Sequence, residues 1–245
     1  MSAQVGPVST PVLSVRNLHV SYNGSAAVTD YSVDLTAGTL TVILGRNGAG
    51  KTSTLRGITG FLGHEAGSAR GSIAVCGQAI RHPSPYRLSR AGVGLVAERD
   101  KVFVGMTIRE QLRLVTSDRR ETDEVLDFFP SLRARIDVRA GLLSGGERQM
   151  LATALVLLRK PQVLLVDELS LGLAPAIVRE LMHYLRRLAD ERNLTILAAD
   201  QAVHASLSVA DNVQIMDSGS LVASGPLAEI DIDAVLNAYL GRDER

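Results

Sequence analysis

The order of apolar and polar positions predicts strands and helices that take turns along the chain. Four short apolar runs lack the polar alternation of a half-exposed strand, which is typical of strands buried on both faces of a sheet. Segments with helical periodicity lie between or after them. This alternation predicts an α/β fold with a mostly parallel sheet. The apolar runs are 40–44, 92–96, 163–166 and 194–199, and the helical segments are 52–61, 145–159 and a segment that opens at Pro175.

Three other stretches carry different patterns. Residues 12–35 hold short β-rich runs separated by turn residues such as Asn23-Gly24, which predicts an N-terminal antiparallel β subdomain. Residues 62–90 are rich in glycine and proline and are interpreted as turns. Two short β-rich runs, 213–216 and 221–223, flank a polar turn and predict a hairpin.

The stretch 107–139 is more charged and helical in pattern than its surroundings. We therefore expect a small helical subdomain, at about 98–145, inserted in the α/β body. The domain division expected from these patterns is a flexible tail over 1–11, a single domain over 12–241 and a second tail over 242–245.

Charge and composition limit the classes of partner. The chain has 26 basic and 26 acidic residues, and this balance argues against nucleic acid as a partner. The single cysteine, Cys76, cannot form an internal disulfide; we expect a buried thiol in a reducing compartment. The first residues show no signal-peptide pattern, and no run approaches the roughly 18 apolar residues of a spanning helix. We expect a protein that meets a membrane only through a partner.

A glycine-rich segment follows the first buried run. Residues 45–53, GRNGAGKTS, match the phosphate-loop pattern G-x-x-x-x-G-K-[ST], in the strand–turn–helix context that the motif requires. Glycines let main-chain amides approach phosphates closely, and the following helix directs its positive end at the anion. Lys51 is expected to reach the β- and γ-phosphates, and Thr52 to hold Mg²⁺. The expected ATP-binding positions here are Gly45, Asn47, Gly48, Ala49, Gly50, Lys51, Thr52 and Ser53.

Two carboxylates end the apolar run 163–166. A strand that ends beside the phosphate loop can place Asp167 on the magnesium, directly or through water, and leave Glu168 to orient and deprotonate the attacking water. Alone, an Asp-Glu pair is equally well explained as a solvated strand end. After a phosphate loop it predicts a hydrolytic site.

A third motif, LSGGERQ at 143–149, resembles the signature motif of ABC ATPases, and the resemblance extends over almost the whole chain. In that family two ATPase domains sandwich two ATP molecules, and each signature faces the partner's phosphate loop. Its physical chemistry agrees, because Ser144, Gly145 and Gly146 open a helix and offer a hydroxyl and amides to a γ-phosphate. The resemblance implies an ATPase with a P-loop core, working with a second ATPase subunit and transmembrane permease subunits on the inner face of the cell membrane.

Three further positions follow from this resemblance. Tyr22 falls where the family has an aromatic ring that stacks on adenine; a cross-strand tyrosine is the less favoured alternative. Glu98 falls where most members have a glutamine that touches the metal and lines the groove for the membrane partner. Gln201 falls where most members have a histidine that senses the γ-phosphate, which makes it a catalytic candidate.

Glutamate and glutamine at these two positions resemble the ATPases of branched-chain amino acid uptake systems, as do DELSLGLAP at 167–175 and the ending AYLG. Importers of this kind also use an extracytoplasmic solute-binding protein. Leu169 in place of proline, and Asp200-Gln201-Ala202 in place of Glu-Gln-Asn, depart from that subgroup.

Other functions fit the motifs less well. Transport of urea, amides or another small solute would use the same ATPase role. A catalytically slow regulatory partner in a heterodimer is favoured by Gln201 and opposed by Lys51, Asp167 and Glu168. A translation or repair ATPase of this family usually has two ATPase domains or a long coiled coil, and the chain has one phosphate loop and no long heptad run.

Overall fold

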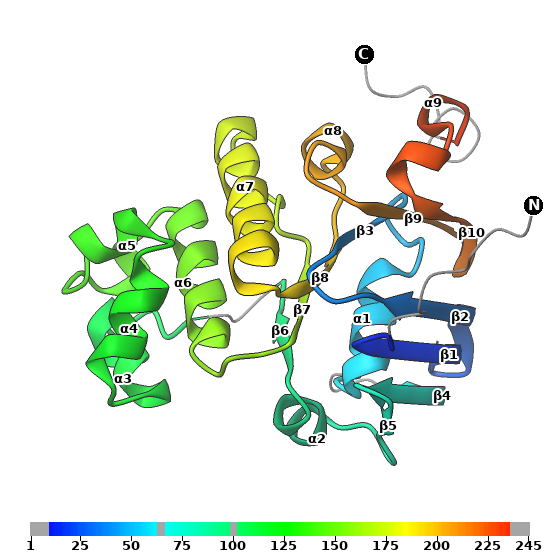
Figure 1. Cartoon of the computed structure of the whole chain (residues 1–245), viewed down its shortest axis with the longest axis horizontal. Coiled ribbons are helices and arrows are strands. Elements are labelled where there is room, and N and C mark those ends of the chain that lie inside the picture. The colour runs from blue at the N-terminus through cyan, green and yellow to red at the C-terminus, as the bar shows by residue number, and fades with distance from the viewer. Residues whose placement is uncertain (1–9, 63–66, 99–101, 236–245) are drawn as a thin grey trace, which may run out of the picture.

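Two sheets form the body of the protein, which the computed structural model describes over residues 10–62, 67–98 and 102–235 (Figure 1). A six-stranded sheet has the order β10-β9-β3-β8-β7-β6, in which all neighbours are parallel except β10 and β9. A four-stranded antiparallel sheet has the order β2-β1-β4-β5. The strands are β1 Leu13–Tyr22, β2 Ser25–Leu35, β3 Leu40–Leu44, β4 Gly67–Val75, β5 Gln78–Ala79, β6 Val93–Val96, β7 Val163–Asp167, β8 Thr195–Ala199, β9 Asn212–Asp217 and β10 Ser220–Pro226.

Helices cover the larger sheet and fill the space between the two sheets. Helix α1 contacts strands of both sheets, while α3 to α5 gather beyond α6, far from the antiparallel sheet (Figure 1). The helices are α1 Lys51–Thr59, α2 Pro85–Arg90, α3 Ile108–Val115, α4 Arg119–Leu126, α5 Pro130–Ala134, α6 Gly145–Leu157, α7 Pro175–Arg192, α8 Val203–Leu207 and α9 Ile232–Val235, with 3₁₀ turns at Ala140–Leu142 and Leu227–Glu229.

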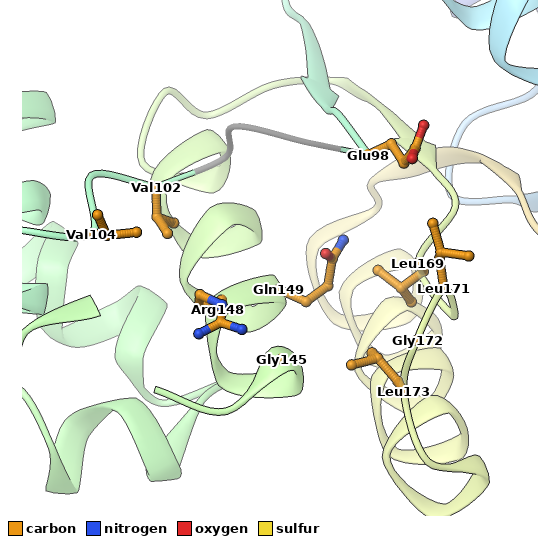
Figure 2. Close-up of a pocket in the computed structure, with 10 residues that line it drawn as sticks. All are labelled: Glu98, Val102, Val104, Gly145, Arg148, Gln149, Leu169, Leu171, Gly172 and Leu173. Carbon is orange, nitrogen blue, oxygen red and sulfur yellow. The ribbon is translucent and has the colours of Figure 1, made fainter. Parts of the chain in front are cut away.

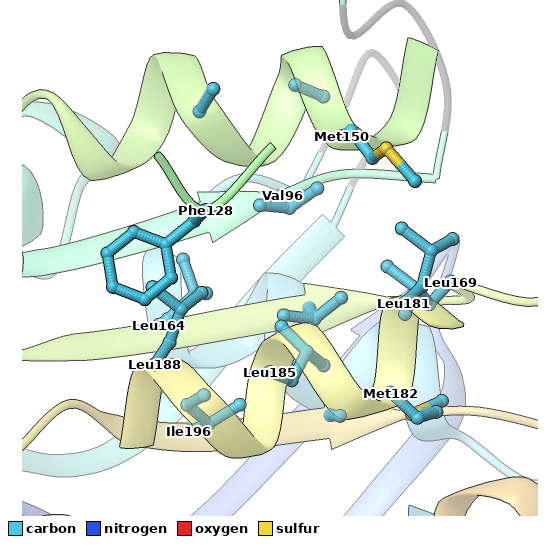
Figure 3. Close-up of a cluster of buried hydrophobic side chains, with 14 of the residues drawn as sticks. Val96, Phe128, Met150, Leu164, Leu169, Leu181, Met182, Leu185, Leu188 and Ile196 are labelled. Carbon is cyan, nitrogen blue, oxygen red and sulfur yellow. The ribbon is translucent and has the colours of Figure 1, made fainter. Parts of the chain in front are cut away.

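Both faces of the six-stranded sheet are covered, which explains the continuous apolar runs in the sequence. Every residue of β3, β7 and β8 is buried. Along β7, Leu164 and Val166 belong to a cluster with α6 and α7, of which Figure 3 shows a part. Val163 and Leu165 belong to a second cluster with α1 and the antiparallel sheet. The expected α/β class with its parallel sheet and N-terminal antiparallel strands is therefore confirmed.

The helices between β6 and β7 are attached to the body through aromatic and ionic contacts with α7. The ring of Phe128 has the guanidinium groups of Arg187 and Arg192 at 5.2 Å each from its centroid. Phe129, beside it, packs against the ring of Tyr184, with centroids 5.3 Å apart. These contacts tie α4 and α5 to the long helix α7, which follows the carboxylates of β7.

Two sequence interpretations are wrong. Residues 62–90, interpreted as turns, contain β4, β5 and α2. Strand β4 is mostly exposed and made of small and polar residues, so its pairing with β1 rather than its own pattern makes it a strand. Cys76, expected to be buried, is exposed, because it occupies the turn between β4 and β5 with φ 48°.

In the described part of the chain, no helix combines the length and the apolar character that crossing a membrane requires. Most of the two predicted tails, and the ending AYLG, lie outside the described residues. The division into tails, domain and inserted subdomain stays a prediction.

Candidate functional site

The glycine-rich segment 45–53 forms the turn between β3 and α1. Gly48 and Gly50 have φ of 81° and 102°, in the left-handed region where a side chain is strained. Gly50 is the N-cap of α1 and has no side chain with which to cap it, so the first amides of the helix are left for a ligand. Asn47 is exposed at the tip and Ala49 is buried beneath it. The local geometry is that of an anion-binding helix terminus.

Lys51, at the first position of α1, is only 4% exposed. Its Nζ donates to the main-chain oxygens of Gly45 at 2.7 Å and Arg46 at 3.2 Å, so the ammonium group lies against the loop. Burial lowers the pKa of Lys51, and the negative charges of Glu168, Asp200 and Asp167 oppose that fall. The cation is thus surrounded by exchangeable acceptors and can turn to a phosphate.

Thr52 and Asp167 meet where α1 begins and β7 ends. Thr52 Oγ1 donates to Asp167 Oδ1 at 2.8 Å, and Asp167 is 2% exposed. Burial raises the pKa of Asp167 to about 6; the charges of Glu168 and Glu98 add to the rise, and the Thr52 hydrogen bond and Arg56 oppose it. A hydroxyl and a carboxylate side by side are oxygen donors of the kind that Mg²⁺ takes. The residues present therefore fit the expected metal.

Glu168 and Gln201 are joined by a hydrogen bond. Gln201 Nε2 donates to Glu168 Oε1 at 3.0 Å, and the Glu168 amide donates to Ala199 O, at the end of β8, at 2.8 Å. Glu168 has φ of 45°, an uncommon conformation for a residue with a side chain. The turn after β7 therefore aims the Glu168 carboxylate at Gln201, which follows β8.

The turn of the β9–β10 hairpin is hydrogen-bonded to the phosphate loop. The Gly219 amide donates to Ala49 O at 3.0 Å, and Gly219 O accepts from the Thr29 amide of β2 at 2.8 Å. A Cβ on Gly50 would lie 2.6 Å from Ala27 O and 3.3 Å from Gly219 Cα. The hairpin was predicted from the sequence, but its role beside the loop was missed, because nothing local in a Ser-Gly turn indicates a distant partner.

The signature residues open α6. Ser144 is its N-cap and forms a capping box with Glu147, whose carboxylate also accepts from Arg135 Nη1 at 2.7 Å. A Cβ on Gly145 would lie 2.7 Å from Leu173, and one on Gly146 would lie 2.4 Å from Ile177. Gly146 thus allows α6 to pack closely against α7, whereas a side chain at Gly145 would meet only the end of the Leu173 side chain.

A pocket of about 400 Å³ opens beside this helix end (Figure 2). Its wall combines Glu98 after β6, Gly145, Arg148 and Gln149 of α6, and the loop that follows β7. No residue of the segment 45–53 lines it. The structure thus brings the phosphate loop together with Asp167, Glu168 and Gln201, and leaves the signature on a separate wall.

Tyr22 ends β1, half-buried, with its ring beside Gly67. Its hydroxyl is buried without a hydrogen-bond partner among the described residues. Ser53 lies half-buried in the first turn of α1. The structure does not test the adenine contact expected of Tyr22.

Asp200 and Ser170 were overlooked as site residues. Asp200 entered the sequence analysis only as a departure from a subgroup pattern, yet its side chain is fully buried between the two turns that hold Glu168 and Gln201. The available signal was a carboxylate placed directly after an apolar strand, as in β7.

A phosphate-loop turn after a buried parallel strand, with an aspartate at the end of a nearby strand, defines a P-loop nucleotide-binding protein. The chain belongs to the ABC transporter family, whose sequence model matches residues 28–170. It is an ATP-hydrolysing transport ATPase.

Known proteins resemble it over most of its length. It is 33% identical to a probable branched-chain amino acid transport ATP-binding protein, LivF, of Archaeoglobus fulgidus, over 89% of this chain and 94% of that one. It is 30% identical to the lipopolysaccharide export system ATP-binding protein LptB of Escherichia coli, over 95% and 98%. A solved ATP-binding cassette of an ABC transporter in its ADP conformation superimposes with a TM-score of 0.78 at 23% identity, over 92% and 97%.

The close fit of Gly50 against Ala27 of β2 predicts unequal effects of two matched substitutions. Gly50→Ala is expected to weaken ATP binding by more than tenfold, because the added Cβ meets the main chain of Ala27. Gly48→Ala shares the positive φ but meets nothing within 4 Å. Its backbone strain of about 1–2 kcal/mol lowers the stability of the protein with and without ATP, so ATP affinity is expected to stay within about threefold of the parent. Titration with a fluorescent ATP analogue measures both. Equal losses would contradict the role of the close contact between Gly50 and β2.

The raised pKa of Asp167 predicts a pH-dependent stability. Without metal and nucleotide, Asp167→Asn is expected to stabilise the protein at pH 7.5 by about 3 kcal/mol at most, because it removes a buried carboxylate whose pKa is about 6 rather than 3.8. The loss of stability that the raised pKa causes is absent below about pH 3.8 and complete above about pH 6. The gain should therefore fall to roughly half at pH 5. Urea unfolding of the variant and the parent at pH 7.5 and pH 5 measures this gain in the free energy of unfolding. A gain of the same size at both pH values would show that it does not come from the raised pKa of Asp167.

Proposed function

We propose that this chain is the ATP-hydrolysing subunit of an importer that takes up branched-chain or related amino acids. It would work on the cytoplasmic face of the membrane with separate permease subunits. The proposal draws on the relatives named for branched-chain amino acid transport and on the Glu98 and Gln201 pair. The observation that carries it is the hydrogen bond from Gln201 to Glu168. Through this bond Gln201, which stands where most of the family has a histidine, contacts the proposed general base.

The proposed catalytic roles follow from the geometry of the buried carboxyl ends of β3 and β7. The amides of the phosphate loop and Lys51 bind the phosphates, and Lys51 exchanges its two main-chain acceptors for phosphate oxygens. Thr52 and Asp167 would hold Mg²⁺, which neutralises charge on the phosphates when it is bound. Glu168 orients the attacking water and accepts its proton, and Gln201 holds the Glu168 carboxylate in place.

The remaining sequence predictions complete this proposed site. Tyr22 stacks on the adenine, and Glu98 lines the approach to the metal. A second ATPase subunit supplies the signature, because Gly145 lies on a pocket wall to which this chain's own phosphate loop does not contribute. The proposed nucleotide contacts of one site are Tyr22, Gly45, Asn47, Gly48, Ala49, Gly50, Lys51, Thr52 and Ser53 of one subunit, with Ser144, Gly145 and Gly146 of the other.

An apolar hollow of about 430 Å³ next to Glu98 suits the permease contact. It is lined by residues of α2, α3, α6 and the end of β6, including Ala97, and by Phe61, which is 48% exposed. Exposed apolar side chains in a hollow are typical of protein contacts. A permease segment bound in this hollow would be displaced when the turn at Glu98 moves.

The test is ATP turnover by the complete complex, with its permease subunits in lipid vesicles and its solute-binding protein. Leucine, isoleucine or valine is expected to raise turnover several-fold, and urea is not. Stimulation by urea or another small solute would replace the substrate, and stimulation by an exported lipid would favour the role of LptB. Turnover that no solute changes would contradict an import role.

The Glu168→Gln variant of the same complex tests the chemistry. It is expected to bind ATP with near-native affinity and to hydrolyse it at least 100-fold more slowly, in keeping with the loss of a general base. Turnover within threefold of the parent would remove Glu168 from this role.

A further inference from the structure

A buried carboxylate links the two turns that carry Glu168 and Gln201. Asp200 is fully buried, directly after β8. Its Oδ1 accepts from the amides of Gln201 at 2.6 Å and Ala202 at 2.9 Å, and also from the Ser170 hydroxyl. Its Oδ2 accepts from the Ser170 amide at 3.1 Å. Both oxygens are thus engaged, as a buried charge requires.

These bonds close a ring through the site. Ser170 is two residues beyond Glu168, and Gln201 is the residue after Asp200. Gln201 returns to Glu168 through its side-chain amide at 3.0 Å. A shift of Ser170 therefore displaces the Asp200 carboxylate, which accepts from it. That displacement moves the main chain at Gln201, and with it the side chain that donates to Glu168.

The ring also continues toward the signature. The Leu173 amide donates to Ser170 O at 3.1 Å, and Leu173 packs where a Cβ on Gly145 would lie. Leu171, Gly172 and Leu173 form one wall of the pocket beside α6 (Figure 2). Leu171 is 54% exposed there and is open to a partner. Ser170 thus connects the signature side with the carboxylate side.

We propose that Asp200 is a positioning residue for hydrolysis, which holds Gln201 against Glu168 and ties both to the loop beneath the signature through Ser170. The proposal rests on the proposed function, because it takes Glu168 as the base. Asp200 touches no reacting atom in this account. It sets the orientation of the residues that do.

The sharpest variant is Ser170→Ala, because it removes only the hydroxyl bond between the two turns. The main-chain amide of residue 170 still donates to Asp200, which also keeps the bonds that it accepts from the Gln201 and Ala202 amides. We expect the kcat of this variant to fall about threefold, with KM for ATP within twofold. Ser170→Thr keeps the hydroxyl and should retain most of kcat. Asp200→Asn places a side-chain NH₂ group against the main-chain N–H of Ser170, so that the hydrogen bond between them is lost. It is expected to lower kcat about tenfold, again with little change in KM.

Gln201→Ala separates positioning from general destabilisation. If Asp200 acts through Gln201, adding Asp200→Asn to Gln201→Ala lowers kcat by less than a further twofold. Independent tenfold losses that multiply would contradict the proposal. So would an equal loss of kcat in Ser170→Ala and Ser170→Thr.

Asp211, a half-exposed carboxylate directly before β9, provides a control at the other end of the strands of the same sheet. Its carboxylate accepts from the Leu40 amide at 2.8 Å and from Arg186 at 2.6 Å. Asp211→Asn is expected to lower the unfolding temperature and leave kcat unchanged. A fall in kcat in this variant as large as that in Asp200→Asn would show that any lost strand-end carboxylate slows the enzyme, and would overturn the proposal.

Glu168→Gln, measured beside these variants, separates the two levels of the account. If Glu168→Gln is inactive while Ser170→Ala and Asp200→Asn turn over at the parent rate, only the positioning role fails. If Glu168→Gln turns over normally, the proposed function fails with it.

Discussion

Charged groups buried at the carboxyl ends of β3, β7 and β8 constrain the rest of the structure. Lys51, Asp167 and Asp200 are each at most 4% exposed, and burying a charge is costly unless hydrogen bonds or opposite charges compensate. Here the compensation comes from main-chain groups, hydroxyls and the attraction between Lys51 and the carboxylates. The turns must therefore keep the conformations that supply these partners.

This requirement explains much of the architecture. The parallel strands bring the three turns to one edge of the sheet, and the hairpin turn at Gly219 and the antiparallel strand β2 hold the phosphate loop from outside. Helices α6 and α7 cover the sheet beneath the site, and Phe128 ties the remote helices to α7. Motion of those helices can thus reach the loop after β7 through packed elements.

The sequence predicts the parts of this arrangement that local patterns specify. Runs such as 163–166 are apolar because both sheet faces are covered, and glycines at 45, 48 and 50 identify a phosphate loop by spacing. Pairing across long distances leaves no such trace. Strand β4 exists because β1 offers it an edge, and the exposed Cys76 follows from its turn. The hydrogen bonds between Asp200 and Ser170 form because β7 and β8 are neighbours in the sheet. The order of residues along the chain does not reveal which strands pair.

We propose that the phosphate loop and the Thr52–Asp167 pair form one site for Mg²⁺ and ATP phosphates. The structure of the Glu168→Gln chain with both bound tests it most directly. We expect Lys51 Nζ to leave the oxygens of Gly45 and Arg46 for phosphate oxygens. Thr52 and Asp167 would hold the metal ion, directly or through water, in place of their present hydrogen bond. Nucleotide bound elsewhere, or Lys51 and Thr52 keeping their present partners beside bound nucleotide, would exclude this shared site.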